Sequence, residues 1–347
     1  MKLPAHILVI RLSAPGDVAM TVPVLHSFQK KYPSVKLTIL TNKRLAPLFN
    51  GLKASLFFAE TKTEHKGFAG LYRLFKQLNN LNKSIPIDAV ADLHNVLRSQ
   101  IIRSLYKLKS VRVAAINKGR EGKKELTRKE NKVLTQLPST FDRYRNVFKE
   151  LSFDFPFDFK TILQHNDLLP EGIKAVTGTK NKSWIGIAPF AAYTDKMYPL
   201  HLMEKAVESL YADSSLQIIF FGSKADGDVL ATWKDKFPNT IIAAGKFKLD
   251  EELLLMSQLD VMVSMDSANM HFASLVNIPV VSVWGATHPF AGFMGWGQSI
   301  DNAAQIDLYC RPCSVFGNKP CYRGDHACMN QLSPSVIIDK IEKIVND

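Results

Sequence analysis

The fold of this chain is decided by the stretch MVSMDSANMHFASLVNIPVVSVWGATHP, residues 262–289. An apolar run ends at Met265 and is followed by Asp266 and Ser267, which are good helix N-caps, and helical spacing then continues to Leu275. We therefore expect a strand that ends on a helix N-terminus, where unpaired backbone N–H groups and a partial positive charge favour a phosphate. An ordinary βαβ unit, in which Asp266 only caps the helix, fits the spacing equally well.

A second loop is expected at the same edge of the sheet. The next apolar run, residues 278–284, ends at Gly285, and Thr287 follows. If the two strands are parallel neighbours, this loop lies beside the helix N-terminus, where doubly wound α/β domains bind their ligands. His271, one turn into the expected helix, could add a hydrogen-bond donor to a phosphate bound there.

The start of the chain shows the same pattern. Residues 6–10 form a short apolar run, typical of a buried parallel strand, and the loop RLSAPGD and a helical pattern over residues 18–32 follow. Asp17, the last residue of that loop, is thereby placed at the binding edge. The chain contains neither G-x-G-x-x-G nor G-x-x-x-x-G-K-[ST], which disfavours hydride transfer and P-loop phosphoryl transfer.

Strands and helices are expected to alternate through the first half of the chain, which predicts a parallel sheet. The fourth strand of this series ends in DLHN, so His94, Asn95 and Arg98 are expected at the same edge as Asp17, although helix capping explains such residues as well. The further strands are expected at residues 36–40, 55–58, 89–92 and 111–115, and the helices at residues 67–80 and 96–108.

A second α/β series begins after residues 152–183, which are rich in turn formers and predict a domain connection. We expect an N-terminal domain over residues 1–165 and a C-terminal domain over residues 166–330. An amphipathic helix near the end, within residues 331–347, is expected to pack back on the first domain. The strands of the second series are expected at residues 184–188, 217–221 and 240–243, and its helices from residue 200 and at residues 250–257.

Composition favours an anionic partner. Lys and Arg number 44 against 32 acidic residues, a net charge of +12, which suggests nucleic acid, an anionic membrane surface or a phosphorylated substrate. An apolar content of 46% is typical of a globular protein. No apolar run approaches the ~20 residues of a membrane span, and the first one ends at Arg11, so we expect neither a span nor a signal peptide, and a cytoplasmic protein.

The strongest basic stretch is NKGREGKKELTRKENK, residues 117–132, with seven basic and three acidic residues. Apolar positions are scarce and glycines interrupt its start, so we expect a solvated, mobile loop. It is either a merely soluble surface or a cationic lip for an acidic substrate at a membrane, in which Lys123, Lys124 and Arg128 contact the acceptor.

Four motifs together resemble glycosyltransferase family nine, the ADP-heptose:lipopolysaccharide heptosyltransferases. They are IRLSAPGDVAMTVPVL, KMYP, DSANMHFASLVNIPVVSVWGATHP and a late cysteine-rich segment, and they follow the family's order over almost the whole chain. The resemblance implies a GT-B fold, in which two Rossmann-like, doubly wound domains face each other across a cleft. It also implies that a peripheral enzyme at the cytoplasmic face of the inner membrane transfers heptose, with inversion, from ADP-heptose to the inner core of lipopolysaccharide.

The resemblance also implies roles for individual residues. Asp17 would be the general base that removes the proton of the acceptor hydroxyl, and Lys196 would neutralise charge on the departing ADP. Because a lysine and a helix N-terminus supply positive charge, this mechanism requires no metal or other cofactor. The implied donor-binding residues are Lys196, Phe247 against the adenine, Asp266, Ser267, Ala268, His271, Gly285 and Thr287. The expected acceptor-binding residues are Ser13, Asn95 and Arg98, with the basic residues Lys123, Lys124 and Arg128.

Two positions depart from the family pattern. Ala268 stands where the family commonly has Gly, and Lys224 stands where an acidic residue often holds the nucleotide. Transfer from another nucleotide-sugar, or non-catalytic binding of a nucleotide-sugar or glycolipid, therefore stay open as alternatives. Nucleic-acid binding is suggested by the net charge alone, because no aromatic residues are interleaved with the basic stretch.

The chain has four cysteines, all near its end: Cys310, Cys313, Cys321 and Cys328. Their spacing, C-x2-C-x7-C-x6-C, differs from the paired C-x2-C of a zinc ribbon, and disulfides are unusual in a cytoplasmic chain. Reduced thiols in a structural loop are the favoured interpretation, and a zinc site and disulfides remain as alternatives.

Overall fold

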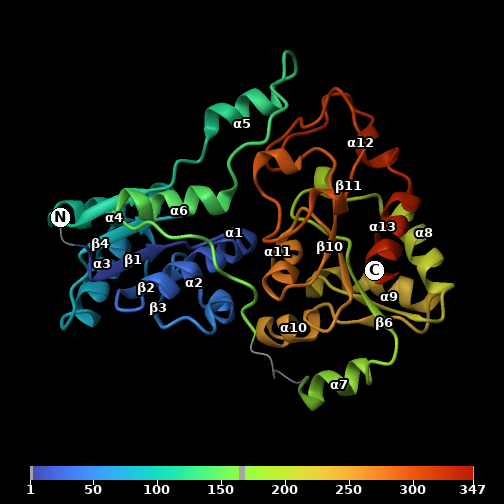
Figure 1. Cartoon of the computed structure of the whole chain (residues 1–347), viewed down its shortest axis with the longest axis horizontal. Coiled ribbons are helices and arrows are strands. Elements are labelled where there is room, and N and C mark those ends of the chain that lie inside the picture. The colour runs from blue at the N-terminus through green and yellow to red at the C-terminus, as the bar shows by residue number, and fades with distance from the viewer. Residues whose placement is uncertain (1–2, 164–168, 347) are drawn as a thin grey trace. The chain divides into compact units, whose positions relative to one another are not determined.

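The computed structural model describes residues 3–163 and 169–346, and the chain forms two compact units (Figure 1). The first unit contains the residues up to 118 and residues 140–162; the second contains residues 119–139 and those from 163 onward. The predicted boundary between residues 165 and 166 lies outside the described residues. No helix in the described ranges combines the length and the apolar composition that crossing a bilayer requires.

The first unit is built on a five-stranded parallel sheet with the strand order β3-β2-β1-β4-β5, which confirms the predicted parallel arrangement. β1 is buried along its whole length because it lies between β2 and β4, and its last residue, Ile10, is in register with Leu40 and with Asp92. The loops after β1 and β4 therefore leave the sheet side by side. The strands are β1 (His6–Ile10), β2 (Lys36–Thr41), β3 (Ala54–Phe58), β4 (Ala89–Asp92) and β5 (Arg112–Ala115).

The helices expected at residues 67–80 and 96–108 are present in the first unit, the first helix differs from the prediction, and α6 was not predicted. The single helix expected over residues 18–32 is two helices that meet at Met20, and the first of them starts earlier, with Pro15 in its first turn, where a missing N–H costs nothing. The helices are α1 (Pro15–Ala19), α2 (Thr21–Lys31), α3 (Gly67–Leu81), α4 (Leu97–Lys107) and α6 (Thr140–Glu150).

The second unit is built on a six-stranded parallel sheet with the order β11-β10-β9-β6-β7-β8. Val283 at the end of β10 is in register with Met265 at the end of β9, and Ser264 is in register with Ala188 at the end of β6. Three strands thus end side by side. The strands are β6 (Ser183–Ala188), β7 (Leu216–Phe220), β8 (Ile241–Ile242), β9 (Val261–Met265), β10 (Val280–Val283) and β11 (Ala303–Ala304).

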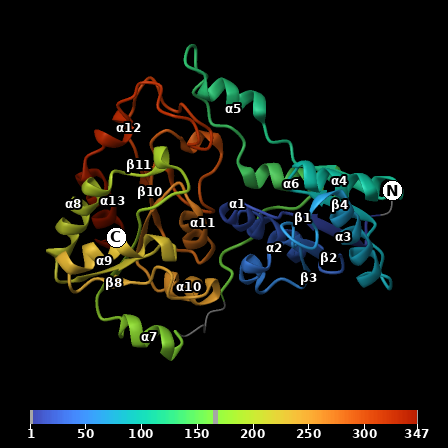
Figure 2. The ribbon, with the colours of Figure 1, turned by 180° about the vertical axis from the view of Figure 1, so that it is seen from behind.

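The helices of this unit include the last helix of the chain, α13. Within the second unit, α13 lies beside α8 (Figure 2) and against β9, β10 and β11, and packing on the first domain stays a prediction. Ile337 and Ile341 are buried in the core of the second unit, which offers this amphipathic helix an apolar face. The helices are α5 (Arg120–Thr127), α7 (Glu171–Thr177), α8 (Leu200–Tyr211), α9 (Gly227–Lys236), α10 (Leu249–Met256), α11 (Ala268–Leu275), α12 (Ala327–Asn330) and α13 (Pro334–Asn346).

The basic stretch is not the solvated loop that its composition predicts. It contains α5, whose Leu126 is fully buried and whose Lys123 is buried with its Nζ 4.2 Å from the centre of the Phe293 ring. Further along, Leu137 N–H donates to the carbonyl of Phe290 at 2.9 Å. A lysine stem packs like an apolar side chain and its ammonium is attracted to an aromatic face, so a count of charges does not reveal this packing.

Candidate functional site

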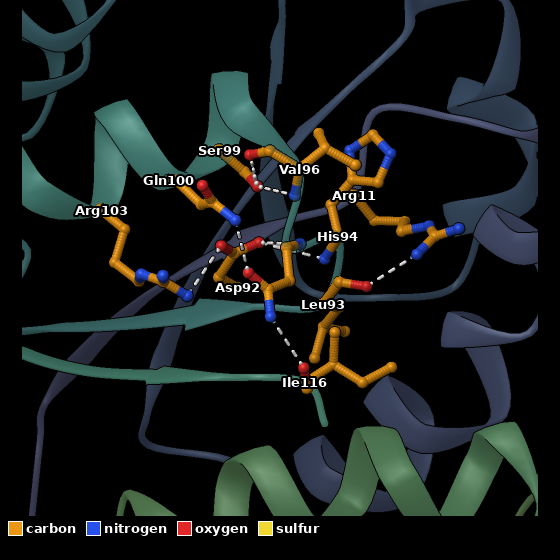
Figure 3. Close-up of polar contacts among 10 residues, drawn as sticks. Arg11, Asp92, Leu93, His94, Val96, Ser99, Gln100, Arg103 and Ile116 are labelled. Atoms are coloured by element: carbon orange, nitrogen blue, oxygen red, sulfur yellow. Dashed lines mark hydrogen bonds and ion pairs between the residues drawn. The ribbon is translucent and has the colours of Figure 1, made fainter. Parts of the chain in front are cut away.

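The first cluster of candidate residues lies where β1 ends. Arg11 follows β1 directly, and its Nη2 is 2.6 Å from Oδ2 of Asp17 on α1. The Arg11 Nη1 donates to the carbonyl of Leu93 at 2.8 Å (Figure 3), so the pair is tied to the neighbouring strand end. Arg11 is buried, whereas the Asp17 side chain is 34% exposed. A fixed guanidinium therefore orients a carboxylate that stays accessible.

The backbone at Asp17 is held as well. Tyr144 on α6 donates its hydroxyl to the Asp17 carbonyl at 3.2 Å. Burial raises the pKa of Tyr144, so its hydroxyl stays protonated and remains a donor. Two elements, α6 and the end of β1, thus position the residue predicted to be the general base.

The turn after β4 is built around the carboxylate of Asp92 (Figure 3). Asp92 is fully buried. Its Oδ1 accepts from the backbone N–H groups of His94 at 3.0 Å and of Asn95 at 2.8 Å, and its Oδ2 pairs with Arg103 at 3.2 Å. The Asn95 amide is also engaged at both ends: its nitrogen donates to the carbonyl of Ile116 at 3.0 Å, and its oxygen accepts from Gln100. Asn95, predicted to bind the acceptor, is thus used by the turn itself.

His94 in this turn differs from its neighbours. Its side chain is 9% exposed, and within the described part of the chain its Nδ1 has no hydrogen-bond partner. Burial, and after it the nearby charge of Arg11, lower the pKa of His94 to about 4, so the ring is neutral at pH 7. The sequence placed His94 at this edge but did not single it out; its position two residues after the end of β4 was the available signal.

The second cluster lies at the ends of β6 and β9. Lys196, in the short 3-10 helix η2 (Thr194–Lys196), places its Nζ 2.8 Å from Oδ2 of Asp266, which follows β9 directly. Asp266 is buried and Lys196 is largely shielded from water, with exposed side-chain fractions of 8% and 15%. An ion pair this well shielded from water holds the lysine ammonium in one position.

Of the two predicted N-cap residues of α11, Ser267 takes that position and Asp266 does not. Asp266 is occupied by Lys196 and does not cap the helix, while Ser267 is the N-cap residue but forms no capping hydrogen bond through its side chain. The first turn of α11, starting at Ala268, is thus left uncapped by side chains, and His271 is buried one turn further on. An uncapped first turn with a lysine beside it is a seat for an anion.

The loop after β10 completes this edge of the second sheet. Gly285 and Thr287 are buried, and the carbonyls of both accept hydrogen bonds from Arg311. The Thr287 hydroxyl is buried and makes no hydrogen bond among the residues described. Three loops therefore meet at this edge, after the adjacent strands β6, β9 and β10. The first carries Lys196, the second carries Asp266 and the start of α11, and the third carries Thr287.

Two further positions concern the nucleotide. Phe247 is partly buried in the loop before α10. Lys224 starts the 3-10 helix η3 (Lys224–Asp226), and Gly245, at φ +68°, approaches it so closely that a Cβ would lie 2.7 Å from the Lys224 Cα. Asp226, the nearby acid, accepts from the N–H and the hydroxyl of Ser223, at 2.7 Å each.

The remaining predicted acceptor residues belong to both units. Ser13, Arg98, Lys124 and Arg128 are exposed. Lys123 is not part of any solvated lip, because its stem is buried and its ammonium lies over Phe293.

The four cysteines are free thiols, so disulfides do not form among them. Burial raises the pKa of Cys328 to about 11 and raises that of Cys313, which keeps these thiols protonated at neutral pH. Across residues 3–163 and 169–346, no group of three or more His, Cys, Asp or Glu side chains has an arrangement that could hold a metal ion.

Comparison with known proteins identifies relatives for most of the chain. The model of glycosyltransferase family 9 (heptosyltransferase) matches residues 71–320. The chain is 23% identical over 336 residues to lipooligosaccharide heptosyltransferase 2 of Campylobacter jejuni, which covers 95% of this chain and 96% of that protein.

Solved structures show the same fold. A family 9 glycosyltransferase from Veillonella parvula superposes with a TM-score of 0.77 at 17% identity, covering 100% of this chain and 99% of that one. The Escherichia coli heptosyltransferase WaaC with ADP-2-deoxy-2-fluoro heptose superposes with a TM-score of 0.67 at 16% identity, covering 97% and 99%. The two doubly wound parallel sheets are those of a GT-B fold.

Proposed function

Because this chain belongs to glycosyltransferase family 9, the heptosyltransferases, we propose that it transfers heptose from ADP-heptose to the inner core of lipopolysaccharide, with inversion. The observation that carries the proposal is the shielded Lys196–Asp266 pair beside the uncapped first turn of α11. A solved relative, WaaC, is described with an ADP-heptose analogue, which supports the choice of donor.

The proposed role of the second unit is to bind the donor and stabilise the leaving group. When the bond between the anomeric carbon and the diphosphate breaks, its electron pair leaves with ADP, and negative charge grows on the diphosphate. The Lys196 ammonium and the N–H groups at the start of α11 are groups of the kind that stabilise such charge. In this proposal they serve in place of a metal ion, and no cofactor is required.

The proposed role of the first unit is to activate the acceptor. The acceptor oxygen attacks the anomeric carbon from the side opposite the diphosphate, which inverts that centre, while Asp17 removes its proton. Arg11 holds the Asp17 carboxylate at 2.6 Å and leaves it one-third exposed, which suits a base that must reach a substrate hydroxyl. The neutral ring of His94 is proposed as a hydrogen-bonding partner for the same substrate.

The acceptor is proposed to be an anionic glycolipid at the inner face of the inner membrane. Support comes from the net charge of +12 and from the exposed basic side chains of Arg98, Lys124 and Arg128. Attraction between these charges and an anionic surface raises the local enzyme concentration and is weakened by salt.

A second candidate donor is another nucleotide-sugar. Lys224 favours it, because a cation stands where an acidic residue often holds the nucleotide, and the nearby Asp226 is occupied by Ser223. The catalytic residues and the inverting course of the reaction would be unchanged.

Calorimetric titration with ADP, UDP, GDP and CMP at one low salt concentration separates these proposals. We expect ADP to bind at least tenfold more tightly than the others, a difference of about 1.4 kcal/mol. If another nucleotide binds more tightly than ADP, the donor is a different nucleotide-sugar and not ADP-heptose. If none of the four nucleotides binds, a non-catalytic protein is favoured. Incubation with ADP-heptose and a heptose-free lipopolysaccharide precursor then tests transfer directly, through the ADP released.

A further inference from the structure

The cysteine-rich segment, residues 310–329, has no part in the chemistry proposed above, yet it contacts two of the three loops at the donor edge. We propose that this segment positions the donor diphosphate site, acting on one loop through Arg311 and on the other through Gly317. This inference rests on the proposed function, because it concerns the same donor site.

Arg311 holds the loop after β10. The side chain is 3% exposed, and its guanidinium donates to four oxygen atoms. Two of them are the carbonyls of Gly285 at 2.6 Å and Thr287 at 3.1 Å, and another is Oε1 of Gln305 at 2.9 Å. The guanidinium carries several N–H donors in a fixed planar arrangement, and these satisfy the buried carbonyls. A side chain without that arrangement would leave these carbonyls without their hydrogen bonds.

The backbone of the segment completes this attachment. The N–H groups of Cys313 and Ser314 both donate to the carbonyl of Ala286 at 3.1 Å. Three consecutive carbonyls, those of residues 285–287, are therefore bound by the cysteine-rich segment. At its other end, Met329 packs so closely on Gly285 that a Cβ there would lie 2.6 Å from the Met329 Cε.

Gly317 holds the loop after β6. A Cβ on Gly317 would lie 2.1 Å from Cγ and 2.6 Å from Cδ of Lys196, so the lysine stem rests directly on the glycine backbone. A second contact comes from His326, whose Nδ1 is 3.2 Å from Oδ1 of Asp195. The segment therefore touches the side chains of two consecutive residues in this loop.

The two attachments together set the distance between the Lys196 ammonium and the loop of Gly285 and Thr287. Asp266 fixes only the end of the Lys196 side chain, whereas Gly317 fixes its stem. A shift of about 1 Å in such groups is enough to weaken catalysis strongly. We therefore expect the segment to control donor affinity and to leave acceptor affinity unchanged.

The first test compares two glycine variants of the same segment. Gly317→Ala places a methyl group against the Lys196 stem at φ +68°, whereas Gly324→Ala creates similar backbone strain at φ +78° with nothing within 4 Å. We expect Gly317→Ala to weaken ADP binding and to raise the donor KM by about tenfold, with the acceptor KM unchanged. Gly324→Ala should lose similar thermal stability and bind ADP as the unmodified chain does.

The second test separates positioning from stability. Arg311→Lys keeps the positive charge but loses the planar guanidinium that donates to several carbonyls at once. We expect weaker ADP binding and a higher donor KM. Asp260→Ala is the control. Asp260 accepts from the backbone N–H of Trp184 at 2.7 Å and pairs with Lys180 at 2.8 Å, near the amino end of β6, whereas the donor site lies at the carboxyl ends of the strands. This variant should lower the melting temperature without changing the donor KM.

The outcomes distinguish the two proposals. If the unmodified chain binds ADP and Gly317→Ala binds it as tightly as Gly324→Ala does, the positioning role is overturned and the proposed function stands. The same conclusion follows if Arg311→Lys and Asp260→Ala change the donor KM equally. If the unmodified chain binds none of the nucleotides, both proposals are overturned.

Discussion

Asp17 and Arg11 form a pair in which one partner is buried and the other remains accessible. A guanidinium at 2.6 Å limits the rotation of the Asp17 carboxylate, which prepares it to accept a proton from one direction. The role of Asp17 as a base is therefore best tested by a change that keeps its shape.

Asp17→Asn should lower turnover by about 10²- to 10⁴-fold, because an amide cannot take the acceptor proton, and should leave ADP affinity nearly unchanged. Initial rates of ADP release and calorimetry measure the two effects. Asp142→Asn is the matched control, since it removes another aspartate of the first unit that pairs with an arginine, Arg145 at 2.9 Å. Normal turnover by the Asp17→Asn variant would exclude Asp17 as the general base.

Lys196→Met should lower ADP affinity by tenfold or more, because it removes the ammonium and leaves the buried Asp266 carboxylate facing the diphosphate. The double variant Lys196→Met/Asp266→Asn should regain part of the stability but not the affinity of the unmodified chain. Lys236→Met, which breaks the exposed pair with Glu204, is the control. Unchanged ADP affinity in Lys196→Met would exclude a contact between this lysine and the diphosphate.

Helix α10 carries an acidic side chain in an unfavourable environment. Burial raises the pKa of Glu252 to about 7. The folded state therefore binds a proton that the unfolded state has already released above its ordinary pKa near 4.5. The free energy of unfolding should accordingly fall as the pH rises from about 4.5 to 7, and stay level above that.

Glu252→Gln should remove this loss, because the amide is neutral at every pH. We expect the variant to be more stable than the unmodified chain at pH 8, by about 1 to 3 kcal/mol, and equally stable near pH 4.5. Urea unfolding at both pH values measures the difference. Asp250→Asn, at an exposed position of the same helix, is the control, and an equal gain there would contradict the assignment to Glu252.

Across the whole chain, the polypeptide passes between the two units more than once. It leaves the first unit after residue 118, returns at residue 140 and leaves it again after residue 162. The basic residues of the first crossing are divided by their packing: Lys123 is buried over Phe293, whereas Lys124 and Arg128 are exposed. Of these three residues, Lys124 and Arg128 are therefore the ones available to an anionic acceptor.

Replacing Lys124 and Arg128 by Ser should raise the acceptor KM at low salt, and the effect should fade as salt screens the charges. The matched control replaces Lys205 and Lys343, two exposed lysines of α8 and α13, by Ser and removes the same charge. Steady-state kinetics at several salt concentrations make the comparison. Equal effects in the two double variants would show that only net charge matters, and no effect would make the basic stretch a merely soluble surface.

The sequence by itself determined the order of the strands and the residues that follow each strand, whereas the helices α5, α6, α7, α9 and α12 were not among those expected. The strands predicted for both sheets are present with ends shifted by one or two residues, and Asp17 and Asp266 follow strand ends as expected. Apolar runs, turn formers and helical spacing are local patterns, so they can be read without knowing the neighbours of a residue. The two-residue strand β11 carries no such pattern and was missed.

Only the tertiary structure decided which side chains meet. The Lys196–Asp266 pair, the burial of Lys123, the packing of α13 and the hold of Arg311 on the loop after β10 all join segments distant in the chain. A capping residue and an ion-pair partner have the same signature in sequence, so Asp266 could not be assigned until Lys196 was found beside it. The physical reason is that a partner is selected by packing and burial across elements, which no local pattern records.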